Sequence, residues 1–208
     1  MKKLQSSLLN MVLVLTGVAV IMGAILAWVN SVTNGPINEQ KDKALADGIK
    51  AVMACDDLTV TKTDTVRQND AKGKEMTFIV YQTQDAKGQD LGAAVQSSSM
   101  GFGGELKVLV GFAPDGKVLG YTLLEHAETP GLGAKADKWF QADGKGSIIG
   151  LDPAEKLTVS KDGGKVDAIT ASTITSRAFL LAVNNAYSAY KNTPVDATSG
   201  ATTIKKDE

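Results

Sequence analysis

The sequence predicts an α+β domain, with a mainly antiparallel sheet and flanking helices, preceded by one N-terminal transmembrane helix. Three observations support this fold class. A long apolar segment near residue 1 carries no charge, several β-rich segments follow without regular alternation with helices, and an amphipathic pattern near residue 180 predicts a last helix. A chain of 208 residues has room for one soluble domain plus an anchor, or for two small domains.

The apolar segment predicts a membrane anchor. No residue is charged between Lys3 and Glu39, and the stretch from Leu8 to Val29 is apolar apart from Asn10, Thr16 and two glycines. At a rise of about 1.5 Å per residue, a helix of this length crosses a hydrocarbon core of about 30 Å. Because the apolar stretch is too long for a cleaved signal peptide, we expect an uncleaved anchor.

The charges beside the anchor predict its orientation. Lys2 and Lys3 precede it, and no basic cluster follows closely. The positive-inside rule then places the N-terminus in the cytoplasm and residues 35–208 on the periplasmic or extracytoplasmic side of the inner membrane. The expected organisation is an anchor (1–34), a membrane-proximal helix (35–55), a folded domain (56–192) and a flexible C-terminal tail (193–208).

Local patterns predict the elements of the domain in order. A break is expected from Thr33 to Pro36, followed by a helix from Ile37 to Ala54. Strands are expected at Met76–Tyr81, Leu91–Gln96, Leu106–Val110 and Val118–Leu124. The last two flank Pro114–Lys117, a hairpin turn in which Pro presets φ and Gly tolerates positive φ.

The second half of the domain is predicted to be more irregular. A short helix is expected from Ala134 to Ala142, and Leu157–Val159 and Val166 flank a turn at Asp162–Gly164. A longer helix is expected from about Ile174 to Lys191. Its buried stripe is expected to consist of Phe179, Ala182, Val183, Ala186 and Tyr190.

Composition excludes several classes of function. With 22 basic and 23 acidic residues, a net charge of −1 and 5% aromatic residues, the chain has no basic face for nucleic acid. Its one cysteine, Cys55, can neither form an internal disulfide nor ligate an iron–sulfur cluster. Its one histidine, His126, lacks the companions of a metal site, so no metal is expected.

The segment from Asp167 to Arg177 is the most informative part of the chain. Six of its eleven residues carry a hydroxyl or a carboxylate, and the predicted helix follows at once. Unpaired N–H groups at such a helix start can hold an anion such as a phosphate. The alternative is an ordinary helix cap formed by Thr173 or Thr175.

This segment resembles the flavinylation motif of the FMN-binding domain family. That family includes the G subunit of Rnf-type electron transport complexes and the C subunit of the sodium-pumping quinone reductase. The motif reads Asp-x-x-Ser/Thr-Gly-Ala-Ser/Thr, and Asp167, Thr170 and Thr173 stand at its marked positions, while Ala171 and Ser172 replace the usual Gly and Ala. The resemblance implies a covalent FMN phosphoester on Thr173, with cofactor contacts from Asp167, Thr170, Ser172, Thr175 and Ser176.

A second stretch matches the short form of the motif letter for letter. Residues 196–202 read Asp-Ala-Thr-Ser-Gly-Ala-Thr, which makes Thr202 an alternative attachment residue. No helix has room to form after it, and the sequence runs only six residues further. We therefore expect attachment at Thr173 and keep Thr202 as the alternative.

Two loops carry the rest of the resemblance. Residues 125–133 read Glu-His-Ala-Glu-Thr-Pro-Gly-Leu-Gly, similar to a second signature of the family that lies against the isoalloxazine ring. The implied contacts are Glu128, Thr129 and Leu132. The glycine-rich run 100–105 precedes a strand and not a helix, which excludes a dinucleotide fingerprint and is typical of a flexible strand entry.

The resemblance implies a membrane-anchored electron-transfer subunit of an Rnf-type complex that couples ferredoxin and NAD redox chemistry to ion translocation. Its implied partners are the other membrane subunits and a flavin transferase that uses FAD. No catalysis is expected from the isolated chain, since the flavin supplies the redox chemistry. The alternative is an anchored extracytoplasmic binding or assembly domain without a redox cofactor.

Overall fold

The computed structural model describes residues 8–69, 73, 75–195 and 201. The chain divides into two compact units, residues 1–44 and 45–208. One helix, α1 (Leu8–Met53), supplies the described part of the first unit, and its last nine residues belong to the second.

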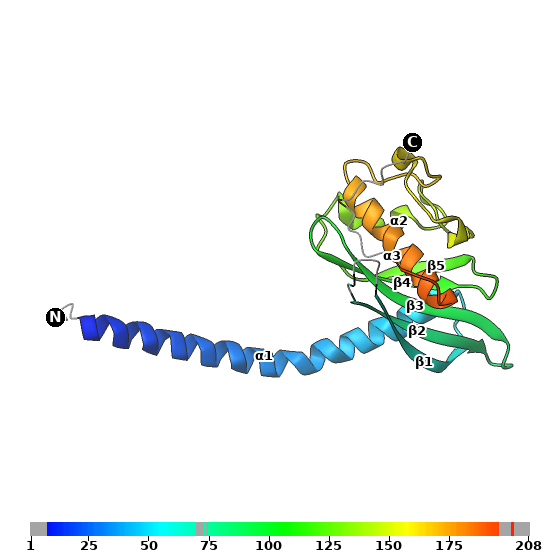
Figure 1. Ribbon diagram of the computed structural model, residues 1–208. Helices are drawn as coiled ribbons and strands as arrows, with labels where there is room; N and C mark the ends of the chain where they lie inside the picture. The colour runs from blue at the N-terminus through cyan, green and yellow to red at the C-terminus, as the bar shows by residue number, and fades with distance from the viewer. Residues whose placement is uncertain (1–7, 70–72, 74, 196–200, 202–208) are drawn as a thin grey trace. The chain divides into compact units, whose positions relative to one another are not determined.

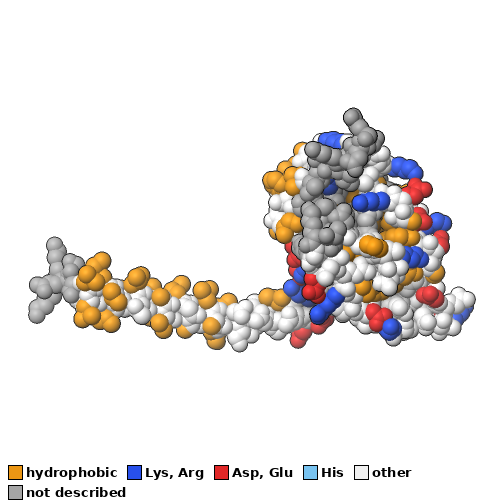
Figure 2. Space-filling model, viewed as in Figure 1, with side chains coloured by type: hydrophobic (Ala, Val, Ile, Leu, Met, Phe, Trp, Pro, Cys, Tyr) orange, Lys and Arg blue, Asp and Glu red, His pale blue; other side chains and the backbone are white. Residues whose placement is uncertain are grey.

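In the first unit, α1 presents apolar side chains all round. Large apolar residues from Leu8 to Ile37 are exposed, as Figure 2 shows along the helix. Of the described residues, only α1 forms a helix long and apolar enough to cross a membrane. A single helix that is apolar on every side and covered by no protein is typical of a membrane anchor.

The break predicted between Thr33 and Pro36 is wrong, because α1 runs through it and contains Pro36. Proline has a helical φ, but it lacks the backbone donor and its ring crowds the carbonyl four residues earlier, so the helix continues through Pro36 at a cost of about 3 kcal/mol. The hydroxyl of Thr33 donates to the carbonyl of Val29 in the preceding turn. The two predicted helices are therefore one.

The second unit is built on an antiparallel sheet, as the sequence predicted. Its five strands pair in the order of the chain. They are β1 (Leu58–Asn69), β2 (Glu75–Asp85), β3 (Asp90–Met100), β4 (Glu105–Phe112) and β5 (Val118–Glu125). The predicted turn joins β4 and β5, with Gly116 at φ +98°, and all four predicted strands are confirmed.

The sequence does not predict β1. This strand lies at an edge of the sheet and pairs only with β2. None of its residues is fully buried, and only Leu58 and Val66 pack partly against the core, while charged residues stand at Lys62, Asp64 and Arg67, so its apolar pattern is too weak to identify a strand. Its remaining signal is a series of β-branched threonines and valines.

After β5 the chain forms mainly short elements. They are η1 (Gly133–Lys135), α2 (Ala136–Trp139), η2 (Pro153–Glu155) and η3 (Ser160–Asp162), followed by the long helix α3 (Thr173–Lys191). The predicted helix at 134–142 is thus a 3₁₀ turn and one turn of α-helix. The predicted strands near 157–159 and 166 reduce to one parallel bridge between Val159 and Val166.

The amphipathic helix α3 lies across one face of the sheet (Figure 1) and packs on β3 and β4. Its predicted apolar stripe is confirmed: four of the five residues are buried, and Tyr190 is partly buried against the same core. Phe179 stacks on Phe140 at 4.3 Å and meets the edge of Tyr121 at 4.7 Å. Burying a Phe of this kind contributes roughly 1.5–3 kcal/mol, which fixes α3 firmly on the sheet.

The end of α1 covers the opposite face. Ile49, Val52 and Met53 form a second cluster with Tyr81, Ala94 and Leu109. Here a glycine is required, because a Cβ on Gly111 would lie 2.3 Å from the carbonyl oxygen of Val52. The sheet is therefore held between two helices, and its β3–β4 loop and the segment after β5 are held beside the start of α3.

Candidate functional site

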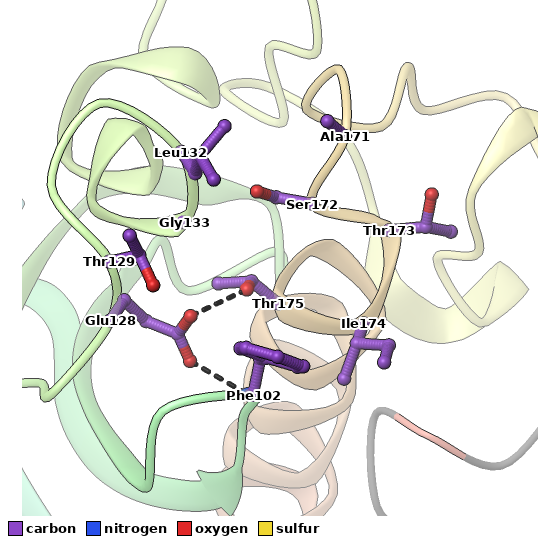
Figure 3. Close-up of a pocket in the computed structure, with 10 residues that line it drawn as sticks. All are labelled: Phe102, Glu128, Thr129, Leu132, Gly133, Ala171, Ser172, Thr173, Ile174 and Thr175. Carbon is purple, nitrogen blue, oxygen red and sulfur yellow. Dashed lines mark hydrogen bonds between the residues drawn. The ribbon is translucent and has the colours of Figure 1, made fainter.

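A pocket opens at the start of α3, between the β3–β4 loop and the segment that follows β5 (Figure 3). Its volume is about 350 Å³, which falls within the range of about 300–1,000 Å³ found for small-molecule sites. The lining residues are Phe102, Glu128, Thr129, Leu132, Gly133, Ala171, Ser172, Thr173, Ile174 and Thr175. Three segments far apart in sequence therefore contribute to one site.

One wall of the pocket is organised by the buried carboxylate of Glu128. The backbone N–H groups of Phe102 and Gly103 donate to its Oε1 at 2.8 and 3.2 Å, and the hydroxyl of Thr175 donates to its Oε2 at 2.7 Å. These bonds join the β3–β4 loop, the segment after β5 and α3. Burying a carboxylate is tolerable only when such donors replace water.

Two glycines let Glu128 occupy this place. A Cβ on Gly101 would lie 2.2 Å from Glu128 Oε1, and a Cβ on Gly133 would lie 2.3 Å from Oε2. The glycine-rich run 100–105 and the Pro-Gly-Leu-Gly sequence thus have a direct structural reason: they leave room for a carboxylate between two loops.

The facing wall is the first turn of α3. Ser172 occupies the N-cap position, but its side chain makes no capping hydrogen bond. The sequence-based alternative of a cap formed by Thr173 or Thr175 is therefore wrong. The first N–H groups of a helix have no acceptor within the helix, and the missing cap leaves them available at the pocket.

The chain turns sharply into α3. Ala171 has a φ of +61°, the left-handed conformation that suits glycine best. Ser176 braces this turn from within, since its Oγ accepts a hydrogen bond from the N–H of Ile169 at 2.9 Å and donates to the carbonyl of Ser172 at 3.0 Å. The usual Gly of the motif is thus replaced by an alanine that takes up the glycine-like conformation.

Thr173 and Thr175 point in different directions from the same turn (Figure 3). Thr175 is 1% exposed and is committed to Glu128. Thr173 is partly exposed at the rim, where its Oγ lies 3.3 Å from Nζ of Lys161. Of the two, only Thr173 has a hydroxyl that an external group can reach.

Beyond Thr173 lies the short helix η3. Arg177 of α3 donates to both carboxylate oxygens of Asp162 at 2.7 Å, a geometry in which two parallel hydrogen bonds reinforce the ion pair. These hydrogen bonds hold the pKa of Asp162 below its usual value. The same contact raises the pKa of Arg177.

Apolar side chains flank the polar start of α3. Phe102 is 71% exposed and Leu132 is 41% exposed, and together with Ile174 they line the pocket. A phenyl ring that stays largely exposed in the isolated chain and lines a pocket favours a ligand with a flat apolar part.

The structure brings together most of the residues singled out from the sequence. Thr173, Ser172, Thr175, Glu128, Thr129 and Leu132 all line the pocket. Ser176 lies behind them, while Thr170 and Asp167 are exposed on the preceding loop, where Asp167 accepts a hydrogen bond from Ser160 Oγ at 3.2 Å. Thr202 lies outside the described residues.

The sequence does not predict that Phe102 and Ile174 belong to the site. Phe102 stands between two glycines, but nothing in this local pattern connects it with residues 167–176. Ile174 gave no signal, because an apolar residue in a helix is expected in any case. His126 is exposed, and no group of three or more potential metal ligands occurs among the described residues.

A known protein family matches the part of the chain that contains the pocket. The FMN-binding domain family matches residues 101–188, a range that contains every residue of the pocket. The chain is also similar to proteins that are named as the G subunit of an ion-translocating oxidoreductase complex. The one from Vibrio cholerae serotype O1 is 33% identical over 181 residues, which cover 84% of this chain and 86% of the relative.

Two further relatives carry the same name. The protein from Shewanella baltica is 32% identical over 183 residues, covering 84% of this chain and 85% of its own length. The protein from Yersinia pestis is 34% identical over 168 residues, which cover 77% of this chain and 79% of the relative. The similarity therefore extends over most of the chain and is not confined to the pocket.

Proposed function

The chain belongs to the family of the G subunits of ion-translocating oxidoreductase complexes, and we propose that it carries FMN as a covalent phosphoester on Thr173. It is an electron-transfer subunit of an Rnf-type complex. The observation that carries the attachment proposal is the position of Thr173: its hydroxyl stands at the rim of a pocket, on a helix start whose first N–H groups are uncapped.

The residues of the pocket fit FMN at both of its ends. The uncapped N–H groups of α3 and the hydroxyl of Ser172 offer donors to a phosphate. Phe102, Leu132 and Ile174 offer apolar surface to a ring system. When bound, the flavin supplies the redox chemistry, and the protein supplies its position and surroundings.

A covalent link has a physical advantage for an electron carrier. A flavin held only by an open pocket dissociates, whereas an ester on Thr173 keeps it at the site during every transfer. The apolar α1 adds a second restriction, because it holds the domain beside a membrane where partner subunits are at high effective concentration.

Attachment requires a donor and an enzyme. With FAD as donor, the Oγ of Thr173 forms a bond to the FMN-side phosphorus, the pyrophosphate P–O bond breaks, AMP leaves with the bonding electrons, and the hydroxyl proton is released. We assign this transfer to a flavin transferase that acts outside the cytoplasm. The isolated chain is expected to catalyse neither this step nor the reaction of the complex.

The sequence also supports a topology. Lys2 and Lys3 before the apolar stretch favour a cytoplasmic N-terminus, which places the FMN-binding domain on the periplasmic or extracytoplasmic side. The implied partners are the other membrane subunits, and the implied overall reaction couples ferredoxin and NAD to ion movement.

Ultraviolet fluorescence of a denaturing gel tests the proposal directly. Full-length protein from cells with an active transferase is expected to fluoresce, Thr173→Val to be dark, and Thr202→Val to fluoresce like the parent. Intact mass and peptide mapping then locate the added FMN. If Thr173→Val fluoresces and Thr202→Val does not, attachment is at Thr202; a dark parent protein would favour the anchored binding domain without a cofactor.

A further inference from the structure

Lys161 is the cation beside the proposed attachment residue. Its Nζ lies 3.3 Å from Thr173 Oγ. Among the residues that the structure describes, Lys161 donates to this neutral hydroxyl and forms no ion pair that would neutralise its charge. Lys165 on the same segment, by contrast, pairs with Glu155 at 2.9 Å.

The turn that carries Lys161 is fixed to the helix that carries Thr173. Its neighbour Asp162 accepts hydrogen bonds from two nitrogen atoms of Arg177. The side chain of Asp162 is 9% exposed and that of Arg177 is 20% exposed. The N–H of Ser160 donates to the carbonyl of Val166 at 2.8 Å, and Gly163 ends the turn in the left-handed conformation. Lys161 is therefore kept near Thr173 by its neighbours, although its own side chain is exposed.

The charge of the pocket makes a cation at this place significant. The pocket lining contains one carboxylate, Glu128, and no lysine or arginine. Asp167 adds a second carboxylate on the loop before α3. The pocket lining therefore supplies a phosphate with no cationic side chain, and the uncapped helix start supplies only partial positive charge.

We propose that Lys161 binds the phosphate that becomes esterified to Thr173, both in the FAD donor and in the finished phosphodiester. This role rests on the proposed attachment of FMN at Thr173. During transfer the Thr173 Oγ–P bond forms, the pyrophosphate P–O bond breaks, AMP departs with the electron pair, and the hydroxyl proton is lost. The non-bridging phosphate oxygens stay negative throughout, and a lysine ammonium 3.3 Å from the attacking oxygen is within reach of them.

Timed flavin attachment to the full-length apo protein tests this role. The detergent-solubilised chain is incubated with flavin transferase and FAD, and covalent flavin is followed by gel fluorescence and intact mass. We expect Lys161→Gln to slow attachment about tenfold, the size of effect of one charged hydrogen bond. Lys161→Arg keeps the charge and is expected to stay within about threefold of the parent.

Lys165→Gln is the matched control, since it removes a lysine of the same segment that is already paired with Glu155. It is expected to label at the parent rate. Raising the salt concentration is expected to slow the parent and Lys165→Gln more than Lys161→Gln, because salt screens the attraction that Lys161 supplies. A purely structural role of Lys161 would not produce this difference, and equal thermal unfolding midpoints show that the fold is intact.

The outcomes separate this inference from the function on which it rests. If the parent is labelled, Thr173→Val stays dark and Lys161→Gln is labelled at the parent rate, the phosphate role of Lys161 is wrong while the attachment site stands. If the parent stays unlabelled, or Thr173→Val takes up flavin, the attachment proposal is overturned and the role of Lys161 with it.

Discussion

On one side of the pocket, two loops close around the carboxylate of Glu128; on the other, the first turn of α3 leaves its N–H groups uncapped and Thr173 partly exposed. The first wall has used its polar groups in holding itself together. On the second wall Thr175 is paired with Glu128, but no side chain caps the first N–H groups of the helix. In a folded protein such unused donors are costly unless water or a ligand meets them, so the difference separates the part that builds the site from the part that meets the ligand.

The largest expected effect on stability concerns the wall that forms around Glu128. Glu128→Ala removes the acceptor of three hydrogen bonds, from the N–H groups of Phe102 and Gly103 and from the hydroxyl of Thr175. We expect a loss of about 3 kcal/mol in the free energy of unfolding, because buried donors are left without a partner. Urea unfolding of the apo protein measures it.

Glu128→Gln provides the control for this substitution. It keeps the shape of the side chain and one carbonyl acceptor, so its free energy of unfolding is expected to fall less than that of Glu128→Ala. If Glu128→Ala were as stable as the parent, Glu128 would not organise the wall, and its direct contact with the flavin would become the better explanation.

The two threonines of α3 test this difference between the walls. Thr175→Val leaves Oε2 of Glu128 without its donor and is expected to cost about 1–2 kcal/mol, while covalent flavin is still attached. Thr173→Val is expected to change stability by less than about 0.5 kcal/mol, while attachment is lost. Unfolding curves of the apo proteins report stability, and gel fluorescence of the mature proteins reports flavin attachment. A Thr173→Val variant as unstable as Thr175→Val would show that the two threonines do not have separate roles.

A smaller effect concerns the pair that holds η3 to α3. Arg177 lowers the pKa of folded Asp162, while an unfolded Asp has a pKa of about 3.9. The pair therefore stabilises the protein above about pH 4, and this stability is lost as the pH falls through the folded pKa. We expect Asp162→Asn to cost about 1 kcal/mol at pH 7 and less at pH 3.

Unfolding free energies of the parent and Asp162→Asn at both pH values check this dependence. Glu155→Gln is the control, because its partner pair with Lys165 is exposed and is expected to contribute little. A constant difference between the parent and Asp162→Asn across this range would show that the carboxylate charge is not what stabilises the turn.

Much of this molecule follows from its sequence because local patterns and packing agree there. The stripe of α3 buries one apolar face of a helix, and the strands β2 to β5 carry apolar residues that pack against α3 on one side of the sheet and against α1 on the other, so local patterns identify these elements. The strand β1 was not predicted because an edge strand that is largely exposed needs few apolar residues. The helix α1 was divided in two because proline was given more weight than the surrounding helix, which tolerates it.

The site shows the same division between local and long-range information. The motif at 167–176 and the loop at 128–133 could be identified in the sequence, because each has a local spelling. Lys161 and Phe102 could not, since their relation to Thr173 depends on how η3 and the β3–β4 loop are brought to α3. Contacts between segments about twelve to seventy residues apart have no local pattern.

Ala171 gives the smallest expected effect and tests the turn that opens the second wall. In the left-handed conformation an alanine has a steric cost of about 1 kcal/mol that glycine avoids, while glycine loses more entropy on folding by about 0.4–1 kcal/mol. These contributions nearly cancel, so Ala171→Gly is expected to change stability by less than about 0.5 kcal/mol and to keep flavin attachment at the parent rate.

Ala168→Gly, in the same loop but without positive φ, gains no steric relief and is expected to lose about 1 kcal/mol. Equal losses for both alanines in urea unfolding would mean that Ala171 does not hold the left-handed turn, and that α3 begins in a different way.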